Sequence, residues 1–229
     1  MADSRIQSAE PRSLIAPAFV VLAIVVFFGL PGMGGERVDL WCQSLFWDGQ
    51  GWLIPHENAV GRALAYDGPK ALIIVWAVVL IGAATFVARV RMRALYLIAC
   101  LAVVSVTCTQ LRAVTGMATP LELKAFGGTY DHLLLFQPKP VGYPSHAFPA
   151  GHASGGFALL GLCWVLATRR WRGLALGLGF GCWMGFYQVA RGEHFLSHTL
   201  ATAALAWFLC AGLAFLMKGP LEREVSASS

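Results

Sequence analysis

Long apolar stretches separated by short polar segments are the main pattern of this 229-residue chain. No charged residue occurs in residues 13–35, 71–88, 94–111, 173–190 and 194–217, or in residues 140–168, which become apolar from about residue 153. A hydrocarbon core about 30 Å thick requires roughly 20 residues of helix, and backbone groups in lipid must pair within their own segment. The pattern therefore predicts six membrane-spanning helices, at about residues 14–30, 71–88, 94–111, 153–168, 173–190 and 199–217.

The composition supports a membrane protein. Hydrophobic residues make up 57% of the chain and charged residues 13%, with a mean hydropathy of +0.64, whereas a soluble domain carries about 25% charged residues. These values argue against a soluble enzyme and exclude a disordered chain. Five of the six cysteines lie in the apolar stretches and only Cys42 in a loop, so we expect no structural disulfide. We predict one all-α integral membrane domain over residues 1–229, a bundle of six transmembrane helices.

Basic residues gather on one side of such a bundle. If the six helices alternate in direction, ten of the 17 Lys and Arg residues share one side: Arg5, Arg12, Arg89, Arg91, Arg93, Arg169, Arg170, Arg172, Lys218 and Arg223. The positive-inside rule makes this side cytoplasmic, together with both termini. We therefore expect a multi-pass protein of the bacterial cytoplasmic membrane. Because topology explains the net charge of +5, the charge does not indicate a nucleic-acid partner.

The histidines all fall on the opposite, outer side, in or beside its loops: His56, His132, His146, His152, His194 and His198. The outer side has two long loops, at about residues 31–70 and 112–151, and a short one near residues 191–198. A purely structural protein has no evident reason to gather imidazoles at one face. Neutral imidazole can act as a nucleophile or carry a proton. The asymmetry therefore indicates a functional site at the outer face.

The entry to the fourth predicted helix contains the sequence Pro149-Ala150-Gly151-His152. A turn of proline and small residues that leads into a helix exposes backbone N–H groups, and a helix N-terminus attracts anions. Small residues also let phosphate oxygens approach the backbone closely. His152, in the first turn, could give a proton to a leaving oxygen. A capped helix start beside an interfacial histidine would have the same sequence, so this motif alone does not decide.

A second polar segment, residues 188–198, joins the fifth and sixth predicted helices. Its His194 and His198 are four residues apart and share one face of a helix. Imidazole is nucleophilic when neutral, and a partner on its other nitrogen fixes the tautomer. Arg191, close by, could bind phosphate through two hydrogen bonds. The same histidine spacing also suits zinc or haem iron, with His152 or Glu193 as a further ligand.

These segments resemble the motifs of the type 2 phosphatidic acid phosphatase superfamily, a family of six-helix membrane lipid phosphatases. Its motifs are Lys-x6-Arg-Pro, then Pro-Ser-Gly-His, then Ser-Arg-x5-His-x3-Asp. The second motif is Pro-Ala-Gly-His in this chain, with Ala150 at the usual serine. The first is Arg112-x6-Thr119-Pro120, which keeps a cation and the proline but has a threonine at the arginine. The resemblance extends over most of the chain, from about residue 39 onward.

The third motif is clearest in the step Gly192-x-His194. In this register Gln188 stands at the usual arginine and His198 at the usual aspartate, and Arg191 could replace the arginine from near the same helix face. A competing register would make His198 the nucleophile, but its spacing from Arg191 is one residue too long. We prefer the register in which His194 is the nucleophile.

The resemblance implies phosphoryl transfer without a metal or cofactor. His194 would attack phosphorus and form a phosphohistidine, and His198 would hold the His194 ring by a hydrogen bond. His152 would protonate the leaving group and then activate water. The phosphate oxygens would be bound by the side chains of Arg112, Arg191 and Lys124 and by the backbone amides of Ala150 and Gly151.

The implied function is hydrolysis of a lipid phosphate monoester or diphosphate at the outer, periplasmic face, and the sequence does not choose among lipids. Polyprenyl diphosphate, phosphatidylglycerol phosphate, phosphatidate and a lipid A-type phosphate all fit. Three alternatives stay open: a lipid-to-lipid phosphotransferase, a membrane metal- or haem-binding protein that uses the histidines, and a relative that binds a headgroup without turnover. The glycines of residues 173–185 permit close helix contacts, within the bundle or in a homo-oligomer.

Overall fold

The computed structural model describes residues 14–144, 146–166 and 169–226, and every structural statement below refers to these residues. Their regular structure is helical, and the only β-type pairings among them are two isolated bridges. The all-α fold class is therefore confirmed. Arg5, Arg12 and the end of the fourth predicted span, residues 167–168, lie outside the described residues.

Each of the six predicted spans coincides with a helical segment. These are α1 (Ile15–Gly29), α4 (Gly68–Phe86), α5 (Arg91–Thr115), α6 with α7 (Ser154–Ala158 and Leu162–Val165), α8 (Arg170–Ala190) and α9 (Leu196–Leu216). A 3-10 turn, η7 (Leu159–Gly161), joins α6 to α7. The shorter elements are α2 (Gly35–Ser44), α3 (Ala59–Arg62), the π-helical η2 (Ala63–Asp67), η3 (Ala88–Val90), η4 (Pro120–Glu122), η5 (Lys124–Phe126), η6 (Gly151–Ala153) and α10 (Lys218–Ser226).

Three helical stretches of the described chain are long and apolar enough to cross a membrane: Ala59–Phe86, Ala88–Glu122 and Leu196–Leu216. Ile15–Gly29 and Gly151–Val165 are apolar but shorter. Large apolar side chains on α1 and α4 are exposed, among them Phe19, Leu72 and Val78. A soluble monomer rarely exposes apolar surface on this scale, so these faces suit contact with lipid.

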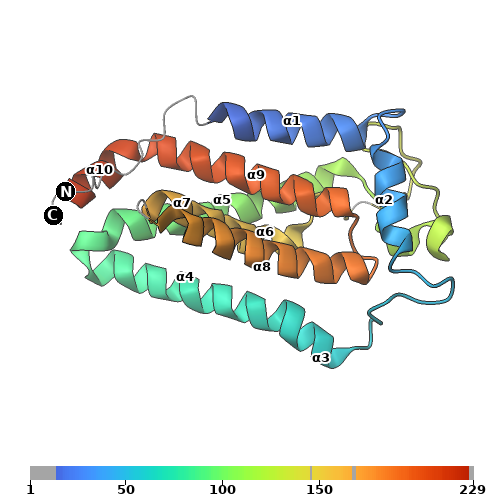
Figure 1. Ribbon diagram of the computed structural model, residues 1–229, viewed down its shortest axis with the longest axis horizontal. Coiled ribbons are helices and arrows are strands. Elements are labelled where there is room, and N and C mark those ends of the chain that lie inside the picture. Colours follow the sequence, from blue (N-terminus) through green and yellow to red (C-terminus); the bar gives the residue numbers. More distant parts are fainter. Residues whose placement is uncertain (1–13, 145, 167–168, 227–229) are drawn as a thin grey trace.

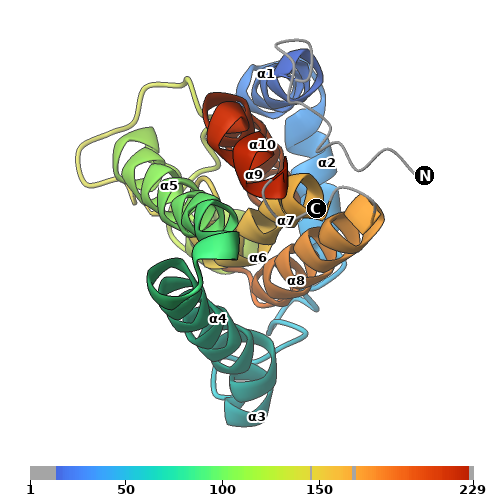
Figure 2. The same ribbon diagram turned by 90° about the vertical axis from the view of Figure 1, so that its left-hand side faces the viewer.

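The long helices lie side by side, with α6, α7 and α9 near the middle of the bundle and α1 and α4 at its edges (Figures 1 and 2). One end, at the left in Figure 1, holds the turn from α4 to α5, the start of α8 and α10. We call it the basic end, because Arg89, Arg91, Arg93, Arg169, Arg170, Arg172, Lys218 and Arg223 belong to these segments. The opposite end, the histidine end, holds α2, α3, η6, the start of α9 and the loops that carry the histidines (Figure 1).

A stripe of glycines on α8 allows the backbone of α6 and α7 to pack directly against it. A Cβ on Gly181 would overlap Cδ1 of Phe157, and one on Gly177 would stand 2.6 Å from the backbone nitrogen of Leu160. Gly173 and Gly185 are buried in the same way, against α7 and α9. Small residues permit this approach because they remove the side chains that would separate the helices. The glycine stripe is therefore part of the bundle core.

Two long helices begin at carboxylates supplied by other elements. The first backbone N–H groups of a helix have no partner within it. Glu224 of α10 accepts the backbone N–H groups of Met92 and Arg93 at 2.7 and 3.2 Å, at the start of α5. Asp39 of α2 accepts the N–H of Ser197 at 2.9 Å, at the start of α9. A negative charge is also favoured there by the helix dipole, so these contacts fix where α5 and α9 begin.

Candidate active site

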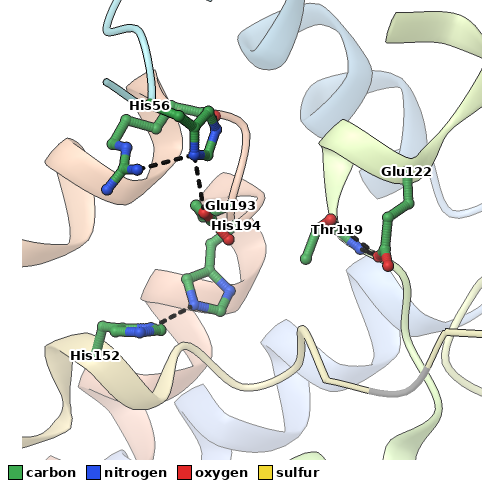
Figure 3. A network of polar contacts seen from close by, with 7 residues as sticks. His56, Thr119, Glu122, His152, Glu193 and His194 are labelled. Carbon is green, nitrogen blue, oxygen red and sulfur yellow. Dashed lines mark hydrogen bonds and ion pairs between the residues drawn. The ribbon is translucent and has the colours of Figure 1, made fainter. Parts of the chain in front are cut away.

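Two histidines from separate segments meet at the histidine end of the bundle. His152 lies in η6 and His194 in the tight turn between α8 and α9. Nδ1 of His152 lies 3.2 Å from Nε2 of His194, so one ring donates its N–H to the lone pair of the other (Figure 3). His194 is 1% exposed. The two motifs that the sequence places 42 residues apart therefore form one site.

His198 lies one helical turn beyond His194 and is fully buried. Its ring packs edge-on between Phe148 and Phe195, with ring centroids 5.3 and 5.4 Å away. No hydrogen bond joins either of its ring nitrogens to Nδ1 of His194, and these atoms are buried. The predicted hydrogen bond from His198 to the His194 ring is therefore not formed, although the two centroids are only 5.8 Å apart. Ring contacts with Phe148, Phe195 and His194 surround the His198 side chain.

Burial and nearby positive charge keep the paired histidines neutral. Burial lowers the pKa of His194 well below its ordinary value of 6.5, and His198, His152 and Arg112 lower it further. Burial also lowers the pKa of His152 to about 4, with contributions from Arg112, Lys70 and Arg191. A neutral imidazole has a free lone pair and is nucleophilic. At neutral pH the two rings are thus uncharged, with Arg112, Lys70 and Arg191 near His152.

Arg112, the cation of the first motif, lies at the end of α5 and reaches the second motif. Its Nε donates to the carbonyl oxygen of His146 at 2.7 Å. A Cβ on Gly151 would stand 3.0 Å from Nη1 of Arg112 and 3.1 Å from its Cδ. The guanidinium therefore lies against the backbone of Gly151, beside His152. The structure thus brings Arg112 and the start of η6 together, in an arrangement that suits a phosphate site.

The backbone amide of Ala150, predicted to bind phosphate, is paired with α9. Its N–H donates to the carbonyl oxygen of His198 at 3.2 Å, and its own carbonyl accepts the hydroxyl of Thr202 at 3.2 Å. Ala150 is fully buried. An amide already paired with α9 cannot also bind a phosphate oxygen in this conformation. Its contribution is to dock the turn before η6 onto the helix that carries His198.

Arg191 is held at the site by two aromatic side chains. Its Nη2 donates to Nδ1 of His56 at 2.8 Å, and Nε2 of His56 lies 3.2 Å from the carbonyl oxygen of the same arginine. Because guanidinium only donates, Nδ1 of His56 must accept, which places the ring proton on Nε2. The guanidinium also lies 5.1 Å from the ring centroid of Tyr187. The sequence does not indicate His56 as a site residue, because only the fold brings it to Arg191.

The turn after Arg191 depends on a glycine. Gly192 has a φ of +75°, which residues with a side chain rarely adopt. A Cβ there would also stand 2.5 Å from the indole of Trp52. The turn carries Glu193, whose Oε1 lies 3.5 Å from Nδ1 of His56 (Figure 3). Gly192 thus allows the tight turn that places His194 between α8 and α9.

Lys124 is not brought to this site by any described contact. Its Nζ binds both carboxylate oxygens of Asp131 at 2.9 Å, and both side chains are exposed. Thr119, at the position of the missing motif arginine, is also engaged elsewhere. Its hydroxyl and its backbone N–H both donate to Glu122, at 2.9 and 2.7 Å. Figure 3 shows this pair on a segment separate from His152 and His194.

A cavity of about 340 Å³ opens beside His152, between α4, α5 and η6. Its polar lining comes from Tyr66, Lys70, Ser105, Thr109, Arg112, His152 and Ser154, and its other walls from Ile73, Ile74, Gly151, Gly155 and Met184. The sequence motifs do not include Tyr66 or Lys70. The only sequence signal for Lys70 is its position beside Pro69 at the start of the second predicted span.

No group of three or more His, Cys, Asp and Glu side chains in the described ranges is arranged to hold a metal ion. His152, His194 and His198 are therefore not such a group. The metal-binding alternative therefore has no structural observation that favours it.

A family model described as the PAP2 superfamily matches residues 93–219, which is more than half of the chain. The match begins near the start of α5 and includes Arg112, His152 and His194. It confirms the resemblance that the motifs indicated. Searches of curated proteins and of solved structures returned no match.

Proposed function

Because the chain belongs to the PAP2 superfamily, which consists generally of phosphatases, we propose that it hydrolyses a phosphate monoester or diphosphate of a membrane lipid. One observation carries the proposal. The Nδ1 of His152 and the Nε2 of His194 lie 3.2 Å apart in a buried site that Arg112 borders. A nucleophile, a proton carrier and a phosphate-binding cation are the parts that metal-free phosphoryl transfer needs.

The reaction would proceed in two steps. Nε2 of His194 attacks phosphorus, forming an N–P bond while the bond from phosphorus to the leaving oxygen breaks. His152 gives that oxygen a proton. A water molecule then attacks the phosphohistidine, His152 accepts a proton from it, and inorganic phosphate leaves as the N–P electron pair returns to His194. Arg112 and Arg191 would bind the equatorial oxygens in both steps.

Substrate binding must change the resting contact between the two rings. Nε2 of His194 cannot attack phosphorus while it is hydrogen-bonded to His152, so the phosphoryl group has to enter between them. The phosphate also brings negative charge next to Arg112 and His152. That charge offsets the cations that lower the pKa of His152. Binding would therefore favour the protonated His152 that the first step requires.

The distribution of charge along the bundle supports an outward-facing site. The basic end carries the arginines of the α4–α5 and α7–α8 turns, and the site lies at the opposite end (Figure 1). By the positive-inside rule the basic end is cytoplasmic. We propose that α1, α4, α5, α6 with α7, α8 and α9 all cross the bilayer, in a bacterial cytoplasmic membrane. The histidine end would then face the periplasm.

A phosphate-release assay tests the proposal. The detergent-purified protein is incubated with phosphatidate, phosphatidylglycerol phosphate, a polyprenyl diphosphate and a lipid A-type phosphate, and released phosphate is measured. We expect release from at least one lipid, inhibition by vanadate and no loss of activity with a chelator. Folded protein that releases phosphate from none of these lipids would refute hydrolysis.

The acceptor and the intermediate are tested in the same preparation. Adding an unphosphorylated lipid alcohol shows whether the phosphoryl group passes to a lipid in place of water. Acid-labile, base-stable labelling from a radioactive substrate identifies phosphohistidine, and it should vanish in His194→Ala. Label that persists in His194→Ala would contradict the assignment of the nucleophile.

A further inference from the structure

Helix α4 presents a cation to the site from outside the region of the family match. Lys70, in the first turn of α4, lines the cavity together with Arg112 and His152. Its Nζ lies 5.7 Å from the ring centroid of Tyr66, and that ring lies 5.2 Å from the ring of His152. The charge of Lys70 contributes to the lowered pKa of His152. The shared cavity wall and the contacts through Tyr66 thus place Lys70 near His152.

The first motif of this chain lacks one of the two cations that the family motif has. Thr119 stands where the family motif has an arginine, and its hydroxyl donates a hydrogen bond to Glu122. Lys124 pairs with Asp131. Thr119 carries no charge, and Lys124 could bind a phosphate only by giving up its ion pair with Asp131. Lys70, in contrast, is an exposed side chain at the cavity wall.

The position of the cavity indicates which part of a substrate it would take. His152 lines the cavity and His194 does not, while the His152 ring contacts both Tyr66 and His194. A nucleophile and a leaving group lie on opposite sides of phosphorus in an in-line displacement. Since His194 is the nucleophile and His152 the acid, the leaving group belongs on the cavity side.

We infer that Lys70 binds the leaving phosphate of a lipid diphosphate, and that this contact makes the diphosphate a better substrate than the corresponding monophosphate. The inference rests on the proposed function. A leaving phosphate carries charge that an alcohol does not, so only a diphosphate gains fully from a cation at this place. Ile73, Ile74 and Met184 form the apolar wall along which the attached chain would continue.

The chain offers a matched control in α3, the helix before η2 and α4. Arg62 lies on the Tyr66 ring as Lys70 does, at 6.0 Å from the centroid. It is paired with Asp67 through an Nε–Oδ2 contact of 3.3 Å and does not line the cavity. Arg62→Met therefore removes a positive charge and a Tyr66 contact while keeping every side chain that lines the cavity.

The experiment compares Lys70→Met, Lys70→Arg and Arg62→Met with the parent protein in detergent, on a prenyl diphosphate and the matching prenyl monophosphate. We expect Lys70→Met to lower kcat/KM for the diphosphate by about tenfold or more, as loss of a charge-assisted hydrogen bond does. The loss for the monophosphate should be about threefold or less. Lys70→Arg should recover most of the difference, and Arg62→Met should stay near the parent on both substrates.

Equal losses on both substrates would overturn the leaving-group assignment, and no loss on either would overturn any role for Lys70 in substrate binding. A binding measurement separates these outcomes from failure of the proposed function. Inorganic pyrophosphate should raise the unfolding temperature of His194→Ala protein more than inorganic phosphate does, and Lys70→Met should abolish that difference. This readout tests Lys70 even if the parent protein hydrolyses neither lipid.

Discussion

The guanidinium of Arg112 lies directly on the backbone of Gly151, so close that a Cβ at this glycine would stand 3.0 Å from Nη1 and 3.1 Å from Cδ. The glycine of the Pro-Ala-Gly-His motif therefore does more than permit a turn. It leaves the space in which the arginine from α5 reaches the start of η6. The two motifs depend on each other for this contact.

This dependence predicts a specific result for Gly151→Ala. The new methyl group should displace the Arg112 side chain and lower kcat/KM by about tenfold to a hundredfold, as loss of one oxyanion donor does. The same substitution should cost little in an Arg112→Ala background, because the side chain it displaces is already gone. Kinetics of the two single variants and the double variant measure this coupling. Fully additive losses would show that Gly151 acts in another way.

The two histidines of the α8–α9 segment should differ sharply. His194→Ala should lose turnover by about four orders of magnitude or more, because it removes the nucleophile. His198→Ala should retain activity within about a hundredfold of the parent, since His198 makes no hydrogen bond to His194. Single-turnover assays with protein checked for folding by size-exclusion chromatography provide the measurement. A phosphoenzyme that forms in His194→Ala and not in His198→Ala would exchange their roles.

Asp39 should make the stability of the protein depend on pH. Burial raises the pKa of Asp39 from 3.8 to about 7, although hydrogen bonds from Ser197 oppose this shift. Between about pH 4 and pH 7 the folded protein holds a proton that the unfolded chain releases, so the stability contribution of Asp39 is lost as the pH rises through this window. Asp39→Asn keeps an oxygen for the N–H of Ser197 but does not ionise.

Unfolding temperatures at pH 5 and pH 8 test this expectation. The difference in unfolding temperature between Asp39→Asn and the parent should favour the variant more at pH 8 than at pH 5. Asp131→Asn, which changes an exposed carboxylate paired with Lys124, serves as the comparison variant at both values. An Asp39→Asn difference that is the same at both pH values would contradict the assigned pKa.

Two glycines of α8 should respond oppositely to alanine. Gly181→Ala places a methyl group against Cδ1 of Phe157, closer than van der Waals contact allows, and overpacking of this kind costs about 1–3 kcal/mol of stability. Gly179 is exposed, and a methyl group there would have no neighbouring atom within 4 Å. Gly179→Ala should therefore be neutral or stabilising by up to about 1 kcal/mol through helix propensity. Thermal unfolding in detergent distinguishes them. Equal behaviour would argue against tight packing of α8 on α6.

The sequence predicts the helices well because hydrophobic length is a property of single segments. It also places His152 and His194 near each other, since both lie in short motifs at the same end of alternating helices, and the structure brings the two rings into contact. The interior of the fourth span is less well predicted: the 3-10 turn η7 separates α6 from α7. Nothing in the local pattern of residues 153–168 signals that interruption, which occurs where α6 and α7 follow the surface of α8.

The sequence fails where a residue's role depends on distant neighbours. The spacing of His194 and His198 is compatible with a hydrogen bond, but Phe148, far away in the chain, occupies the space beside His198. The backbone N–H of Ala150 donates a hydrogen bond to the carbonyl oxygen of His198 in α9. His56 and Lys70 have no motif around them, so only the packing of α4 and its preceding loop against the histidine end reveals them.

The carboxylate that α2 supplies to the start of α9 has a consequence for how substrate preference could change. The match to the superfamily covers residues 93–219, yet Asp39, His56 and Lys70 all reach the region of the reacting histidines from the chain before it. A protein reduced to the matched region would keep the phosphoryl-transfer motifs and lose the groups that position α9, orient Arg191 and line the cavity. Exchanging residues 35–70 between relatives would therefore be a direct route to new lipid selectivity with the chemistry left in place.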